Sequence, residues 1–411
     1  MRGLTRRIGS RFRALIGADP ASLRQGLAAL LVSSGGDLLA GLTLGAITGT
    51  LADLPGLLVL VPAAIGMRGN VFGALGSRFG TSIHAGTFTL SRRAETVVGQ
   101  NVIAAMALSL SISFALAVLA KAVAIGFGLP HTISIAYFIV ISIVGGAISS
   151  VFVLLLTIGV AAGSVRYGWD MDNVAAPLVT AAGDMVTLPS LFVATFIVGP
   201  GIVTPIIAVV TSFVAVAALV AAFRSGLAIA LRILRESVPI LLIAGLIDVV
   251  AGLTIEKRLN SFLAFPALLV LVPPFLEDTG ALGGILSARL ASKLHLGTIE
   301  PTNVPPRVAR DDFALTFVFA VPVFTLVAIS SDVAANVAGL ASPGVVKMVL
   351  ISLIGGFMAT IIAIGIVYYG AIATYRLGLD PDNHGIPLIT SSMDLVGAFA
   401  LILAIVLVGV H

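Results

Sequence analysis

Eleven apolar stretches, each long enough to cross a lipid bilayer, constrain this chain more than any other feature of its sequence. A spanning helix needs roughly 20 mainly apolar residues, and only helices or closed barrels satisfy their backbone groups inside lipid. The stretches cover residues 27–51, 54–77, 97–125, 132–162, 173–199, 203–223, 237–255, 262–286, 313–340, 345–372 and 384–410. Only 10% of the residues are charged, against roughly 25% in soluble domains. The sequence therefore predicts an all-α, polytopic membrane protein.

The second half of the chain repeats the first at a shift of 211 residues. Residues 57–62 and 268–273 both read LLVLVP, and Asp37 matches Asp248. Further along the shift becomes 210, so that Asp184 matches Asp394. Each copy has five apolar stretches, and the extra stretch 203–223 gives both copies the same orientation. We therefore expect two parallel five-helix repeats joined by a linker helix, with transport sites at the repeat interface near the membrane midplane.

The positive charges indicate how the chain is divided and oriented. With a cytoplasmic N-terminus, 18 of the Lys and Arg residues fall on the cytoplasmic side and 4 outside, as the positive-inside rule requires. These charges lie mainly in short loops between apolar runs, a pattern of membrane topology and not of nucleic-acid binding. We expect an integral cell membrane protein with an external C-terminus. Its predicted parts are a retained basic arm (1–25), a first repeat (26–200), a linker helix with a basic loop (201–236) and a second repeat (237–411).

Acidic residues inside the apolar stretches are the strongest functional signal. A carboxylate at the bilayer centre costs a few kcal/mol, so it usually faces the bundle interior or a water-filled path. Six acids are placed in this way: Asp37, Asp184, Asp248, Glu277, Asp278 and Asp394. For Asp184 and Asp394 the alternative is a protonated carboxyl bonded between helices. For Asp37 and Asp248, ion handling and interhelical bonding are equally favoured.

Two matched segments surround the aspartates of the fifth stretches. They read PLVTAAGD at 177–184 and PLITSSMD at 387–394. Proline, threonine and aspartate at i, i+3 and i+7 share one stripe of a helix. Thr180 and Asp184, and likewise Thr390 and Asp394, are therefore predicted to face one axial cavity. The absence of cysteine excludes thiolate ligands and leaves hard oxygen ligands.

The second stretch of each repeat contains glycines and prolines that predict a break in the helix. The segments read VPAAIGMRGNVFGALGSR and VPPFLEDTGALGGILSAR, and unwound backbone at this depth is tolerated only where it lines a cavity or is buried in protein. Asn70 offers an amide oxygen in the first copy, whereas Glu277 and Asp278 bring carboxylates to the second. Unequal half-sites are expected from this difference, and Arg68 is a candidate ion-pair partner for one of the acids.

These motifs resemble the membrane domain of the MgtE magnesium transporters and of their tandemly duplicated relatives among the solute carriers. The resemblance rests on PLVTAAGD, PLITSSMD and GMRGN at 66–70, and it covers about residues 27–200 and 237–410. It implies a magnesium-selective channel or carrier, in which a single chain takes the place of a family dimer with one pore. The family's ligand aspartate of the fifth helix corresponds to Asp184 and Asp394. The family's cytosolic regulatory domains have no counterpart in residues 1–25.

The function expected from the sequence is therefore transport of a divalent cation, most simply Mg²⁺, through a pore between the repeats. Magnesium keeps several waters and binds through one or two carboxylates. The candidate ligands are Asp184, Asp394, Asp37, Asp248, Thr180, Thr390, Asn70, Glu277 and Asp278. We expect no enzymatic activity, no organic cofactor and no nucleic-acid partner. Divalent ions and the bilayer are the expected partners of a pseudo-dimeric monomer, with further oligomerisation left open.

Two alternatives remain at this stage. A Na⁺- or H⁺-coupled cation exchanger of the same fold would use the same intramembrane acids, because aspartates also serve proton relays. An intramembrane aspartyl protease needs two facing aspartates that share a proton. The protease is disfavoured because neither Asp37 nor Asp184 follows the glycine-any-glycine pattern of one such family.

Overall fold

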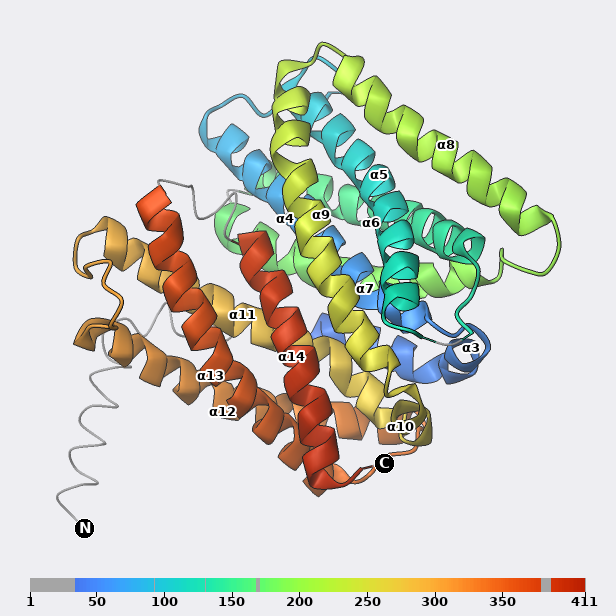
Figure 1. The fold of residues 1–411 in the computed structure, drawn as a ribbon. Coiled ribbons are helices and arrows are strands. Elements are labelled where there is room, and N and C mark those ends of the chain that lie inside the picture. The colour runs from blue at the N-terminus through green and yellow to red at the C-terminus, as the bar shows by residue number, and fades with distance from the viewer. Residues whose placement is uncertain (1–33, 92, 130, 168–170, 378–385, 411) are drawn as a thin grey trace.

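The computed structural model describes residues 34–410 except 92, 130, 168–170 and 378–385, and for 171–177, 377 and 386 it describes the backbone alone. Within those ranges every regular element is helical (Figure 1). The chain begins there with a helix over residues 34–46. It continues with α3 (Thr48–Asp53), α4 (Leu57–His84), α5 (Val97–Gly126), α6 (Ile135–Tyr167), α7 (Met171–Thr195), α8 (Val203–Arg224), α9 (Ala228–Glu256), α10 (Leu259–Ala264), α11 (Ala267–His295), α12 (Arg307–Val337), α13 (Val345–Leu377) and α14 (Ile386–Val408).

Ten helices in the described part of the chain are long and apolar enough to cross a membrane. The predicted first span, 27–51, lies partly outside the described residues, and its described portion is the 34–46 helix followed by α3. The prediction of an all-α integral membrane protein with multiple spans is confirmed.

The internal repeat is visible in the element bounds. The short helices α3 and α10 are related by the shift of 211 residues, and α6 and α13 by the shift of 210. α8 stands between the two sets and packs on α5 and α6 at the edge of the bundle (Figure 1). Its apolar side chains are largely exposed, Phe213 at 75% and Val209 at 70%, as expected for a helix that faces lipid.

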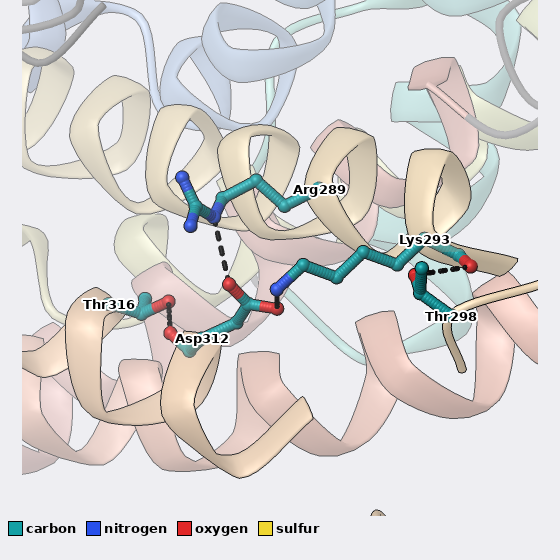
Figure 2. Close-up of polar contacts among 5 residues, drawn as sticks. All are labelled: Arg289, Lys293, Thr298, Asp312 and Thr316. Atoms are coloured by element: carbon teal, nitrogen blue, oxygen red, sulfur yellow. Dashed lines mark hydrogen bonds and ion pairs between the residues drawn. The ribbon is translucent and has the colours of Figure 1, made fainter. Parts of the chain in front are cut away.

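Matched positions make matched contacts in the two halves. Arg289 and Lys293 of α11 both bond to Asp312 of α12, at 2.9 and 2.6 Å (Figure 2). The equivalent first-repeat pair is Arg78 and Asn101, whose Nε and Oδ1 lie 2.8 Å apart. The backbone arrangement is therefore repeated even where the charge of the side chain differs.

The halves are interlocked because the first helix of each packs on the second helix of the other. Gly41, on the 34–46 helix, lies directly against the carbonyl oxygen of Val270 in α11. Gly252 of α9 lies in the same way against the carbonyl of Val59 in α4. A Cβ on either glycine would overlap that backbone. Small residues permit such close approach between membrane helices, and the exchange places both first helices between the repeats.

The prediction of a broken second helix in each repeat was wrong. α4 and α11 are continuous, with Pro62, Pro273 and Pro274 inside them. These prolines lie beyond the first turn, so each removes one backbone hydrogen bond without interrupting its helix. The chain turns just before α4, where Gly56 adopts the left-handed φ of 94°. Glu256 of α9 caps this start, accepting bonds from Gly56 N at 2.7 Å and Leu58 N at 3.1 Å.

Candidate cation-binding site

Six acidic side chains from both repeats gather where the exchanged helices meet. Asp37, Asp184, Asp248 and Asp278 are each at most 3% exposed, while Glu277 and Asp394 are partly buried. They come from the 34–46 helix, α7, α9, α11 and α14. The sequence predicted these six residues as candidate ligands, and the fold brings them into one region.

The first half-site consists of Asp37, Asp184, Glu277 and Asp278. The carboxyl groups of Asp37 and Asp184 lie within hydrogen-bonding reach of each other, and Glu277 interacts electrostatically with both. Among the described residues, no donor reaches either oxygen of Asp37 or Oδ2 of Asp184. Two carboxyl groups in contact in a buried site need a proton or a cation between them. Asp278 is better satisfied, since Ser34 Oγ donates to its Oδ1 at 3.1 Å.

The second half-site consists of Asp248 and Asp394. A Cβ placed on Gly66 of α4 would lie 2.9 Å from Asp248 Oδ2 and 3.8 Å from Asp394 Oδ2, so both oxygens face one small space. Ser391 donates a hydrogen bond to Asp248, whose Oδ1 has no donor within the described residues. Asp394 also interacts electrostatically with Asp184 and Glu277, which places the two half-sites within range of each other.

The remaining predicted ligands lie on the same helices. The Thr180 methyl group packs on α4, with Cγ2 3.8 Å from the Cβ position of Gly69, and Asn70 is partly buried one residue further along. Thr390 Oγ1 donates to Pro387 O at 3.1 Å. Among the described residues, no three acidic or histidine side chains converge closely enough to chelate one bare ion.

Arg68 does not pair with any of these acids, contrary to one sequence-based interpretation. Its side chain is fully buried among α4, α5 and α6. Its guanidinium donates to Ser149 Oγ at 3.1 Å, Ala64 O at 2.8 Å and Ser113 Oγ at 3.2 Å. Gly146 leaves the space that the guanidinium fills. Arg68 therefore provides no counter-charge to the acid cluster.

Comparison with known families decides what kind of protein carries this cluster. The sequence model of MgtE, described as a divalent cation transporter, matches residues 61–194 and 272–404, one match in each repeat and together more than half of the chain. The chain belongs to the MgtE family. MgtE proteins are transporters and not enzymes, so the intramembrane protease alternative is excluded.

Curated relatives of this MgtE chain extend the similarity over most of its length. Solute carrier family 41 member 3 of Rattus norvegicus is 24% identical over 408 residues, covering 92% of this chain and 85% of its own length. The Mus musculus member 3 is 25% identical, covering 85% of this chain and 75% of its own length. Member 2 of Homo sapiens is 24% identical, with 84% and 63% covered. No solved structure matches the chain.

Three residues of this candidate site were missed by sequence reasoning. Ser34 and Ser391 donate to the acids, and Gly66 provides the space beside Asp248 and Asp394. Serine and glycine are too common in membrane helices to stand out. Gly66 did carry a signal, because the shift of 211 residues matches it with Glu277.

Proposed function

We propose that this protein transports Mg²⁺ across the membrane along a path between its two repeats, with the six clustered acids holding the hydrated ion. The observation that carries this proposal is the contact between the Asp37 and Asp184 carboxyl groups, in which both oxygens of Asp37 and Oδ2 of Asp184 lack donors within the described residues. Such a pair is costly unless a cation or proton neutralises it. Membership of a divalent cation transporter family favours the cation.

The spacing of the acids suits a hydrated Mg²⁺ ion better than a bare ion that the carboxylates chelate directly. It dehydrates reluctantly and is commonly held through waters and one or two carboxylates. Asp184 and Asp394 interact across the repeat interface, so one hydrated ion between them would contact both halves. We further infer that Thr180, Thr390 and Asn70 supply neutral oxygens beside this path, and that a single chain forms the whole path.

A coupled exchanger remains the second candidate, and the same contact favours it. Two carboxyl groups that share a proton in the absence of metal would release that proton when a cation binds. Export or import of the cation could then be coupled to proton movement through the same side chains.

Reconstitution in proteoliposomes tests both candidates. We expect an entrapped magnesium indicator to report uptake driven by a Mg²⁺ gradient alone, with protein-free vesicles as the control. Uptake that requires an opposing H⁺ or Na⁺ gradient would establish the exchanger instead. Absence of flux for Mg²⁺, Mn²⁺ and Co²⁺ under every gradient would refute divalent cation transport by this chain.

A further inference from the structure

The two half-sites differ at positions that the repeat makes equivalent. Asp37 and Asp184 match Asp248 and Asp394, but Glu277 and Asp278 match Gly66 and Met67. Glu277 interacts with Asp37 and Asp184, and Gly66 lies beside Asp248 and Asp394. The matched backbone positions therefore adjoin matched acid pairs, and only the second repeat supplies carboxylates there. The first half-site has four carboxyl groups and the second has two.

The supply of hydrogen-bond donors increases the difference. In the first half-site, Ser34 donates a hydrogen bond to Asp278. Asp37 is only 1% exposed, and both of its carboxylate oxygens lack a donor within the described residues. In the second half-site, Ser391 donates to one of only two carboxyl groups. Unsatisfied carboxylate oxygens at high density in a buried place attract a dication most strongly.

We propose that the half-sites are two unequal cation subsites, and that the first, built on Asp37, Asp184 and Glu277, binds the divalent ion more tightly. Asp248 and Asp394 then form a weaker second station. This inference rests on the proposed function, because it assigns the order of binding along the same path. Asp394 interacts electrostatically with Asp184 and Glu277, so an ion bound in one subsite changes the affinity of the other subsite for a cation.

Unequal stations have a clear advantage for transport. Conduction requires that an ion bind well enough to enter and weakly enough to leave. A four-carboxylate subsite alone would hold a dication too firmly. A neighbouring two-carboxylate station provides a route of release, and a second ion entering it would repel the first.

The test is a binding titration of the purified full-length protein in detergent, with Mn²⁺ as the probe and electron paramagnetic resonance to count free ions. Wild-type protein should bind Mn²⁺ in two phases of different affinity. Glu277→Gln should weaken the tighter phase by about 10- to 100-fold, the usual loss when a partner of a bound metal is removed. Asp248→Asn should leave the tighter phase within about threefold and remove the weaker one.

Two further variants make the result specific. Asp278→Asn alters a carboxyl group that Ser34 already satisfies, and should cost less than Glu277→Gln. Asp53→Asn removes an exposed acid on α3 outside the cluster, and should change neither phase. A melting temperature within a few degrees of wild type confirms that each variant is folded.

The outcomes separate this inference from the proposed function. Equal weakening of a single phase by Glu277→Gln and Asp248→Asn, in a protein that transports Mg²⁺, would overturn the unequal subsites and leave the transport function standing. A wild-type protein that neither binds Mn²⁺ nor transports Mg²⁺ would overturn both.

Discussion

At the scale of single residues, Gly66 tests whether the second half-site needs its open space. The Cβ of an alanine there would lie 2.9 Å from Asp248 Oδ2, which is too close for an undisturbed carboxylate. We expect Gly66→Ala to lower Mg²⁺ flux severalfold in proteoliposomes. Gly73→Ala is the matched control on the same helix, because nothing lies within 4 Å of the Cβ position of Gly73. Equal flux in the two variants would show that Asp248 moves without consequence.

Arg68 provides a prediction about stability and not about transport. Arg68→Ala should leave a cavity and unpaired serines, at a cost of about 2–5 kcal/mol. Arg68→Met should cost less, because it fills the volume and removes a buried charge. Thermal unfolding in detergent would compare them, with Arg78→Met as a control at a partly exposed arginine. A methionine variant no more stable than the alanine variant would assign the stability to the guanidinium bonds.

The surroundings of Arg68 also show what residue patterns could and could not predict. The sequence showed the charge of Arg68 within an apolar span, and we expected one of the intramembrane acids to pair with it. The actual acceptors are neutral groups, including Ser113 of α5 and Ser149 of α6, and nothing local to Arg68 indicates that these two helices supply them. The acids themselves were predictable because membrane burial is costly for any carboxylate.

At the scale of helices, the exchanged packing rests on Gly41 and Gly252. An added methyl group would meet backbone carbonyls of Val270 and Val59, which cannot rotate away as a side chain can. We expect Gly41→Ala and Gly252→Ala each to destabilise the fold by about 1–3 kcal/mol, measured by thermal unfolding. Gly49→Ala in α3, where the space is open, should be neutral or slightly stabilising. Stability unchanged in both variants would mean that the first helices are not tightly held.

Helix positions were predicted more accurately than helix ends or continuity. The span 237–255 was found within α9, which runs from Ala228 to Glu256 and includes Arg232 and Arg235. Hydropathy marks the hydrocarbon layer, whereas backbone bonding continues beyond it. The predicted breaks in α4 and α11 are absent because glycine and proline composition alone does not distinguish an unwound helix from a closely packed one. Gly252 against Val59 is a contact between halves that no local pattern reveals.

At the scale of the whole molecule, the repeat was predictable from the sequence because identical residues recur at a nearly constant shift. The interlocking of the halves was not readable, since it depends on which helices pack together across the interface. In the second repeat, Phe324 fills the position of Ser113 and packs on Phe275, with ring centroids 5.0 Å apart. The same backbone frame therefore supports a polar interior in one half and an aromatic one in the other.

Membrane orientation is also a property of the whole molecule, and it gives a further prediction. The chain has no cysteine, so a single introduced thiol can be labelled without background. Ser134 and Ser225 are exposed residues in loops assigned to the outside and the cytoplasm by the loop charges. An impermeant maleimide should label Ser134→Cys in intact cells and Ser225→Cys only after permeabilisation. The reverse pattern would invert the topology.

The central claim is that acids from both repeats act together in transporting the dication, and a double-mutant cycle on Mg²⁺ flux tests it most directly. Asp184→Asn and Asp394→Asn keep the side-chain size but remove the charge, and each should lower flux by about 10- to 100-fold. Because Asp184 and Asp394 interact across the interface, the double variant should depart from the sum of the single effects in free energy. Strictly additive losses would indicate that Asp184 and Asp394 act independently, and wild-type flux in a folded double variant would contradict the site.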